Sequence, residues 1–99
     1  MEENIRYIKL FDIYGNLLTE KQKNNFKLYY MDDLSLREIA ELYNISFQSV
    51  RDSIEVSKKL LDNYENNIKM LEKNSYIDEL KKLLINVDNE DVKNILMKL

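Results

Sequence analysis

The sequence has 99 residues, the usual length of one domain, and a formal net charge of −3. The absence of cysteine and histidine excludes disulfides and thiolate metal sites, and removes the commonest general base and metal ligand. There is no proline and only one glycine, so few residues interrupt helices. We therefore expect a single all-α domain over residues 1–99 that is not an enzyme and needs no cofactor or metal.

The chain is expected to remain soluble in the cytoplasm. Its first residues include two glutamates and lack the basic start and small-residue cleavage site of a signal peptide. No apolar run in the sequence approaches the about 20 residues that cross a membrane.

The first helix is predicted over about residues 4–17. A helix at a protein surface usually has one apolar stripe and a polar back. Here apolar residues occupy more than one side, which predicts burial against the core on one side and against a neighbour on the other. This pattern is one argument for a homodimer. The apolar positions are Ile5, Tyr7, Ile8, Leu10, Phe11, Ile13, Tyr14 and Leu17.

Two capping boxes predict where the next two helices begin. In a capping box, a serine or threonine and a glutamate or glutamine three residues later each bond the other's backbone N–H. Thr19 with Gln22 marks the start of a second helix, and Ser35 with Glu38 marks the start of a third.

A helix-turn-helix is predicted over about residues 35–61. Two helices that cross through a short turn need a small residue where their backbones approach, and Ala40 provides it. Asn44 tolerates the left-handed conformation of such a turn, and Ser46 is placed to cap the next helix. The alternative is a helical hairpin in a bundle, built for packing alone. The apolar positions expected to face the crossing are Ile39, Tyr43, Ile45, Val50 and Ile54.

The fourth helix is predicted to be long, because apolar residues recur at steps of three and four without a slip. If it continues from residue 46 to 73, it spans about 42 Å. Such a seam predicts coiled-coil-like packing against another helix, either of the same chain or of a second copy. The seam consists of Phe47, Val50, Ile54, Ser57, Leu61, Tyr64, Ile68 and Leu71.

A break is expected at Asn74–Ser75, before a C-terminal extension over about residues 74–99. The extension is predicted to form one or two shorter amphipathic helices, with Asp88–Asn89 as a cap. Its apolar residues keep the helical spacing, at Ile77, Leu80, Leu84 and Val87 and then at Val92, Ile95, Leu96 and Leu99.

The candidate binding residues lie at the start of the fourth helix. In helix-turn-helix proteins that read DNA, this helix enters the major groove and its first residues touch base edges. Gln48 could pair with adenine, Arg51 with guanine or a phosphate, and Phe47 could touch a thymine methyl group. The full predicted set is Ser46, Phe47, Gln48, Ser49, Arg51, Asp52 and Glu55.

The charge of the predicted helix-turn-helix argues against tight binding to duplex DNA. Phosphate contacts supply much of the affinity of DNA-binding proteins, which usually carry a basic stripe. Over residues 35–61 the charges cancel instead, with Arg37, Arg51, Lys58 and Lys59 against Glu38, Glu41, Asp52 and Glu55.

Three runs of the sequence resemble the YlxM family of small bacterial proteins, which is itself similar to region four of sigma factors. They are LLTEKQ at residues 17–22, YYMDDLSLREIAE at residues 29–41, and the pattern ISxQxVxDxI at residues 45–54. The resemblance covers about residues 4–73 and implies a sigma-like helix-turn-helix fold with a regulatory, DNA-binding role. It also implies a part in the signal recognition particle pathway, because genes of this family neighbour those for the particle's protein and its receptor.

The sequence departs from the family pattern where DNA would be read. Phe47 stands where the family often has arginine, and Glu55 and Val56 replace residues that are commonly basic. These differences remove positive charge from the reading face.

Two functions remain as hypotheses. The first is a DNA-binding regulator whose dimer matches two half-sites. The second is an adaptor that binds protein or ribonucleoprotein, such as the protein or RNA of the signal recognition particle, without direct contact to duplex DNA. The Phe47 region and the exposed apolar side of the first helix would make that contact.

Overall fold

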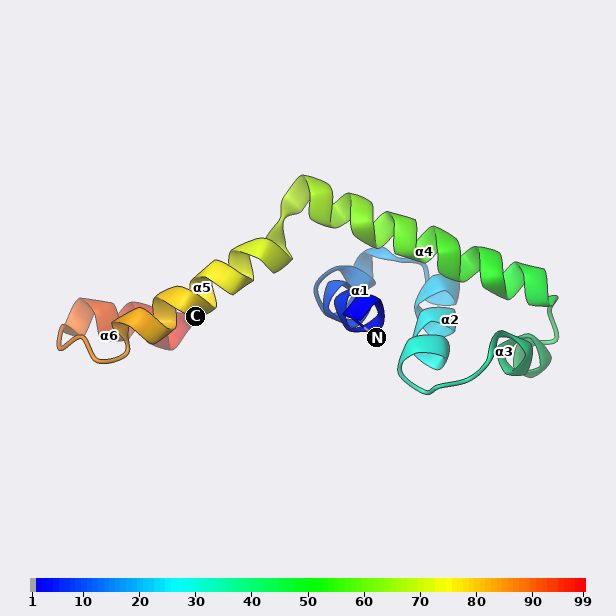
Figure 1. The fold of residues 1–99 in the computed structure, drawn as a ribbon, viewed down its shortest axis with the longest axis horizontal. Helices are drawn as coiled ribbons and strands as arrows, with labels where there is room; N and C mark the ends of the chain where they lie inside the picture. Colours follow the sequence, from blue (N-terminus) through cyan, green and yellow to red (C-terminus); the bar gives the residue numbers. More distant parts are fainter. Residues whose placement is uncertain (1) are drawn as a thin grey trace. The chain divides into compact units, whose positions relative to one another are not determined.

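The computed structural model describes the backbone of residues 2–99 and the side chains of residues 3–99. Over this range the chain forms helices and turns without strands, which confirms the all-α fold class (Figure 1). No helix in the same range is both long and apolar enough to cross a bilayer. The elements are α1 (Glu2–Tyr14), the 3-10 turn η1 (Gly15–Leu17), α2 (Glu20–Tyr30), α3 (Leu36–Tyr43), α4 (Phe47–Ile68), α5 (Met70–Leu84) and α6 (Glu90–Lys98).

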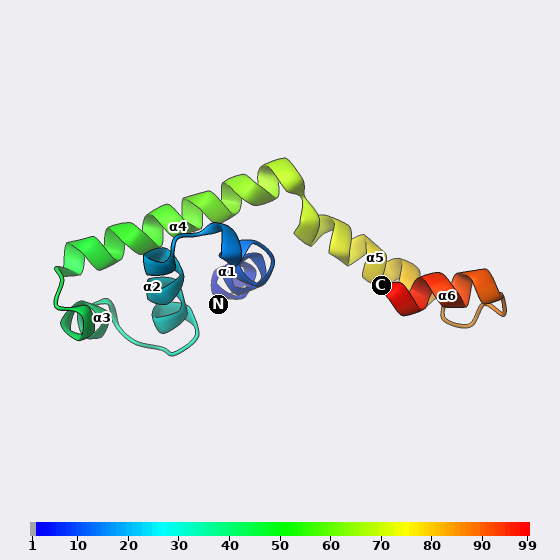
Figure 2. The ribbon, with the colours of Figure 1, turned by 180° about the vertical axis from the view of Figure 1, so that it is seen from behind.

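The chain divides into two compact units, one that ends at Ile68 and one that spans Lys69–Leu99. In the first unit α1, α2 and α3 all pack along α4, as both views of the ribbon show (Figures 1 and 2). The predicted first helix corresponds to α1 together with η1. The largest apolar side chains with no exposed surface are Leu10, Phe26, Ile39, Val50 and Leu61.

The seam of α4 is covered by helices of the same chain. Val50, Ile54 and Leu61 are buried where α1, α2 and α3 pack against α4. Phe47 and Ile68, at the two ends of the helix, remain 44% and 42% exposed. The sequence left open whether the seam packs against the same chain or against a second copy. In the structure, helices of the same chain cover the middle of the seam.

The apolar sides of α1 are also partly covered within the first unit. Phe11 stacks on Phe26 of α2, with ring centroids 4.5 Å apart. Tyr14 packs against Tyr64 of α4, with centroids 5.9 Å apart. Ile5 remains 54% exposed. The apolar sides of α1 led to the prediction that a second copy covers one of them. Contacts to α2 and α4 of the same chain account for much of that surface.

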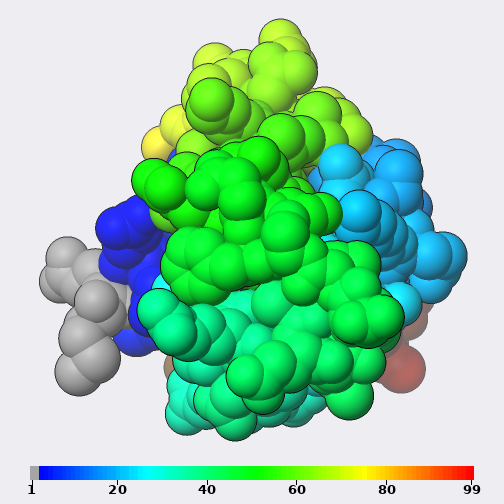
Figure 3. Space-filling model, turned by 90° about the vertical axis from the view of Figure 1, so that its right-hand side faces the viewer, coloured from blue at the N-terminus to red at the C-terminus, as the bar shows by residue number. Residues whose placement is uncertain are grey.

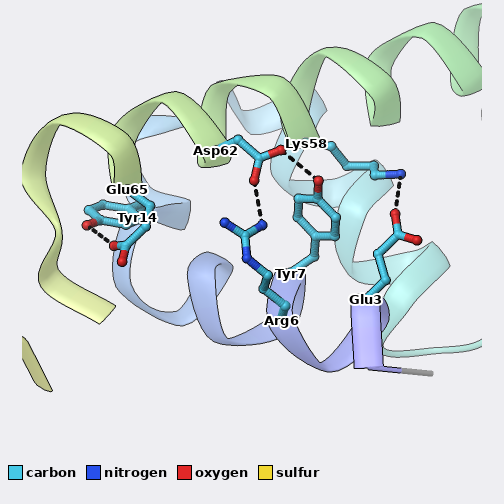
Figure 4. A network of polar contacts seen from close by, with 7 residues as sticks. All are labelled: Glu3, Arg6, Tyr7, Tyr14, Lys58, Asp62 and Glu65. Carbon is cyan, nitrogen blue, oxygen red and sulfur yellow. Dashed lines mark hydrogen bonds and ion pairs between the residues drawn. The ribbon is translucent and has the colours of Figure 1, made fainter. Parts of the chain in front are cut away.

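Polar contacts fasten α1 to α4 beside these rings (Figure 4). Asp62 of α4 accepts hydrogen bonds from the guanidinium of Arg6 and from the phenol of Tyr7, the latter over 2.7 Å. Lys58 forms an ion pair with Glu3 at 3.2 Å. These residues lie near the start of α1 and in the second half of α4, so the contacts fix how the first helix crosses the long one.

The same contacts change the acidity of the groups involved. Burial, together with the hydrogen bond to Asp62, raises the pKa of Tyr7 to about 12. Burial opposes ionisation of Asp62, but the hydrogen bonds from Tyr7 and Arg6 outweigh it and lower the pKa of this carboxyl. Further along α1, the Tyr14 phenol donates a 2.8 Å hydrogen bond to Glu65.

The fourth helix ends earlier than the sequence predicts. Lys69 adopts the left-handed conformation, with φ 60° and ψ 32°, and separates α4 from α5. The expectation of one helix to residue 73 and a break at Asn74–Ser75 was wrong, since α5 runs through both residues. Just before the break, the Asn67 side chain donates to the carbonyl of Asn63 at 2.9 Å, the kind of side-chain bond that competes with helix continuation.

The second unit is a pair of helices without a buried residue. α6 returns alongside α5, and Lys81 Nζ donates to the carbonyl of Leu99 at 3.0 Å. Asn89 caps α6 by accepting from the N–H groups of Asp91 and Val92, as the sequence predicts. An apolar groove of about 320 Å³ lies between the two helices. No side chain of α5 or α6 is buried, so this unit lacks a closed core.

Candidate macromolecular interface

The turn between α3 and α4 has the geometry of a helix-turn-helix. The capping box of Ser35 and Glu38 is complete and starts α3. Asn44 ends it with φ 53° and ψ 47°, in the left-handed region, and its N–H reaches the carbonyls of Ala40 and Glu41. Ile45 N–H also donates to the Ala40 carbonyl, at 3.0 Å. The local signals in the sequence therefore predict the turn correctly.

A small apolar core lies beneath this turn. Ile39 and Ala40 of α3 are buried against Val50 and Ile54 of α4. Because α3 contributes only a methyl group at Ala40, the backbones of α3 and α4 can approach closely there. This core holds the first turns of α4 in place while leaving their outer sides at the surface. Partly buried side chains pack around it, from Leu28, Tyr30, Leu34, Leu36 and Ile45.

The residues predicted to bind a partner all lie at the start of α4, at the surface of the first unit. Figure 3 faces this end of the molecule, with the start of α4 in green above α3. Ser46 caps α4 by accepting from the N–H of Ser49 at 3.0 Å. Of the predicted set, Ser49 is half-buried, and the others are exposed: Ser46, Phe47, Gln48, Arg51, Asp52 and Glu55.

The structure divides these residues between two sides of α4. A shallow groove of about 550 Å³ lies between the start of α2 and the start of α4. Phe47, Arg51 and Glu55 do not line it, and their spacing of four places them together on another side of the helix. The groove brings together Ser46, Gln48, Ser49 and Asp52 with residues at the start of α2. These are the cap residue Thr19 and the helix residues Lys21 and Gln22, none of which was predicted as part of the site.

Two of the polar candidates are occupied with each other. The side-chain amide of Gln48 donates to the carboxylate of Asp52 at 2.9 Å. A contact from Gln48 to adenine would require this bond to break or rearrange. Glu55 lies 3.7 Å from Lys58, whose ammonium also reaches Glu3. Carboxylates thus engage the side-chain amide of Gln48 and the ammonium of Lys58, two groups near the surface that was predicted to read DNA.

An exposed apolar surface flanks the turn, which we call the turn patch: Leu42, Tyr43 and Phe47. Leu42 and Tyr43 end α3 and are 61% and 42% exposed, and Phe47 begins α4 and is 44% exposed. The prediction that Tyr43 faces the helix crossing was therefore only partly right. Leu42 was not among the residues predicted from the sequence. It stands three residues after the buried Ile39, so helical spacing alone does not show that it is exposed.

The charges around the turn patch are mixed rather than basic. α3 exposes Arg37 together with Glu38 and Glu41, and the start of α4 exposes Arg51 and Asp52. The backbone N–H of Ser35 bonds to the Glu38 carboxylate, which lowers the pKa of that group and keeps it ionised. The surface thus has carboxylates where many DNA-binding helices have lysine or arginine.

Comparison with known proteins agrees with this geometry. The model of the UPF0122 family, described as "Putative helix-turn-helix protein, YlxM / p13 like", matches residues 1–98. The chain belongs to the UPF0122 family. The match includes α5 and α6, for which the sequence gives helical periodicity as the main signal.

Several UPF0122 proteins are similar over most of the chain. One from Clostridium acetobutylicum is 50% identical over 82 residues, which cover 83% of this chain and 71% of the relative. One from Clostridium kluyveri is 51% identical over 85 residues, covering 86% and 77%. One from Bacillus mycoides is 40% identical over 101 residues, covering 96% and 92%. The similarity thus spans both units.

Proposed function

We propose that this protein is a regulatory helix-turn-helix protein of the cytoplasm that binds a protein or ribonucleoprotein partner and catalyses no reaction. The observation that carries the proposal is the turn patch, in which Phe47 occupies the first position of α4 and is 44% exposed. Aromatic side chains such as that of Phe47 are enriched at the centres of protein interfaces.

The charge of the surface favours a protein partner over duplex DNA. A DNA-binding face gains most of its affinity from cations that replace the counterions of the phosphates. Here Glu38, Glu41 and Asp52 lie on the two helices that would approach the duplex, and they oppose Arg37 and Arg51. Apolar contact at the turn patch needs no such excess of positive charge.

The signal recognition particle is the partner that we propose. The basis is the resemblance of residues 17–22, 29–41 and 45–54 to the YlxM family, whose genes neighbour those for the particle's protein and its receptor. An adaptor with an apolar contact surface and little net charge at its turn suits binding to a protein component or to its complex with RNA.

The test measures binding of the full chain to the purified particle protein, with and without its RNA. We expect Phe47→Ala to raise the dissociation constant by about tenfold or more. Ile68→Ala is a matched control, because Ile68 is 42% exposed at the opposite end of α4, away from the turn. Equal effects of the two substitutions, or the absence of binding by the wild type, would contradict the proposal.

A second candidate function is direct reading of duplex DNA, favoured by the exposure of Gln48 and Arg51 on the first turns of α4. It predicts binding to duplex DNA that weakens steeply with salt, as counterion release requires. Arg51→Ala should then weaken binding and reduce the salt slope. A weak response at low salt that is independent of sequence would count against this candidate.

A further inference from the structure

A pocket of about 410 Å³ lies in the first unit, between α2 and the turn that joins α3 to α4. Pockets that bind small ligands usually have about 300–1,000 Å³ of space and combine apolar walls with a few polar groups. This pocket falls within that range of size and has both kinds of wall. It is lined by Lys21, Asn24 and Asn25 of α2, Tyr43 of α3 and Ile45 of the turn.

A nearly buried amide forms part of the pocket wall. Asn25 is 1% exposed, and its side-chain nitrogen donates to the hydroxyl of Ser53 on α4 over 3.1 Å. Within residues 3–99 this is the one hydrogen bond of the Asn25 side chain. Every completely buried side-chain nitrogen or oxygen in that range has a partner, so the carbonyl oxygen of Asn25 keeps a small accessible surface. Because Asn25 lines the pocket, this oxygen can accept a hydrogen bond from an N–H group of a ligand there.

Lys21 provides a positive charge at the pocket without a counterion from the chain. It is exposed on the first turn of α2 and forms no ion pair with any of the residues that the structure describes. Lys23, on the same helix, pairs instead with Glu20 at 3.3 Å. Among the described residues, no aspartate or glutamate lines the pocket. The pocket therefore favours a ligand with a negative charge that can pair with the ammonium of Lys21.

Tyr43 and Ile45 form the apolar side of the pocket. Tyr43 ends α3 and is 42% exposed, and Ile45 is half-buried just after the left-handed Asn44. The turn thus brings both side chains to the pocket, while α2 supplies the polar groups. An exposed tyrosine ring offers a face on which the planar ring of a ligand can stack.

A nucleotide combines the groups that suit this pocket, namely a planar base, an N–H donor on that base and a phosphate. An inorganic anion would satisfy only Lys21, and a fatty acid would leave the oxygen of Asn25 without a donor. We propose that the pocket binds a nucleotide whose base carries an amino group, either free or as an unpaired nucleotide of an RNA strand. The base stacks on Tyr43 and donates to Asn25, and the phosphate pairs with Lys21. The proposal goes beyond the function given to the turn patch, with which the pocket shares Tyr43 alone.

The test is calorimetric titration of the full chain with adenosine monophosphate, together with NMR spectra that follow the side-chain amide of Asn25. We expect this amide signal to shift on binding, and Lys21→Gln and Tyr43→Leu each to raise the dissociation constant by about tenfold. Lys59→Gln and Tyr29→Leu are matched controls, because both residues are exposed and neither lines the pocket. The absence of binding by the wild type, or equal losses in the control variants, would overturn the proposal. Circular dichroism checks that every variant is folded.

Two further variants separate the pocket from the surfaces beside it. Lys21 also lines the groove between α2 and α4, whereas Gln48 lines that groove and not the pocket. Gln48→Ala should therefore leave the affinity for adenosine monophosphate unchanged, and a loss would place the ligand in the groove and overturn the proposal. Phe47→Ala should also leave this affinity unchanged while it weakens the binding of a protein partner. Failure of the nucleotide site and failure of the function proposed for the turn patch are thus distinguishable.

Comparison ligands test the chemistry of the pocket. Inorganic phosphate and L-tryptophan should each bind about tenfold more weakly than adenosine monophosphate, and equal binding of either would overturn the assignment to a nucleotide. Uridine monophosphate lacks the amino group on its base and should also bind more weakly, and equal binding would overturn the part given to Asn25. A short single strand of adenylate RNA distinguishes the two sources. Much tighter binding of the strand identifies RNA, and equal binding per nucleotide identifies the free nucleotide.

Discussion

The phenolic oxygen of Tyr7 lies 2.7 Å from a carboxylate oxygen of Asp62, and this bond fastens the first helix to the long fourth helix. Tyr7→Phe removes the donor and keeps the ring. We expect the free energy of unfolding to fall by about 1 kcal/mol, the usual net value of such a bond. Urea unfolding followed by circular dichroism measures the loss. Tyr29→Phe is the control, because Tyr29 is exposed, and an equal loss there would contradict the role given to Tyr7.

Ionisation of Tyr7 should weaken the fold at alkaline pH. The pKa of Tyr7 is raised to about 12 from an ordinary value of 10.0, so the folded protein holds the phenolic proton more tightly than the unfolded chain. The corresponding stability is fully present below pH 10 and is lost as the pH rises through about 12. We expect the difference in unfolding free energy between the wild type and Tyr7→Phe to shrink over this range. A constant difference would refute the assignment.

Protonation of Asp62 should weaken the same contact at acid pH. The hydrogen bonds from Tyr7 and Arg6 lower the pKa of Asp62 below its ordinary value of 3.8 despite burial. Its contribution to stability is therefore present above that value and is lost as the pH falls through the lowered pKa. Asp62→Asn should be less stable than the wild type at neutral pH, and the two should converge in acid. Unfolding curves at several pH values test this, and a gap that widens in acid would contradict it.

Asn44 should be replaceable by glycine but not by alanine. Its φ of 53° lies in the left-handed region, where a Cβ without a compensating polar group costs about 1 kcal/mol. We expect Asn44→Ala to lower the free energy of unfolding by about that amount and Asn44→Gly to change it little. Asn24→Ala is the control for losing an exposed asparagine from a regular helix. A glycine variant as unstable as the alanine variant would argue against backbone conformation as the cause.

The sequence predicts the starts of α2 and α3 accurately because each start depends on residues only three positions apart. The hydroxyls of Thr19 and Ser35 accept the N–H groups of Gln22 and Glu38, at 3.2 Å and 3.1 Å. The left-handed end of α3 at Asn44 is likewise a property of one residue type in a short turn. Local chemistry was sufficient in all of these cases.

The end of α4 could not be predicted in the same way. The apolar spacing continues from Ile68 to Leu71 across Lys69, and lysine is a good helix former without a preference for the left-handed region. Apolar periodicity therefore predicts one continuous helix even where a single residue, Lys69, interrupts it. The bond from the Asn67 side chain to the Asn63 carbonyl is a weak local signal, since asparagine is common at such ends.

The sequence predicts where the candidate interface lies along the chain, but not which of its residues share one side of α4. Sequence alone places Phe47, Gln48 and Arg51 on the first turns of α4. Which of them line the groove depends on where α2 packs, a contact between residues far apart in the sequence. The exposure of Leu42 and Tyr43 is also a result of packing, because it depends on how much of α3 its neighbours cover.

The shortness of α3 has a consequence for how partner binding can be detected. Leu36–Tyr43 is only about two turns long, and an isolated helix in water needs about 12–15 residues to be even marginally stable. Its shape therefore depends on Ile39 and Ala40 being held against α4. A partner that recognises the turn binds the folded protein and not the unfolded chain. A saturating concentration of that partner should therefore raise the melting temperature of the protein. Thermal unfolding of the helices, followed by circular dichroism, would then report binding at a surface that contains no tryptophan.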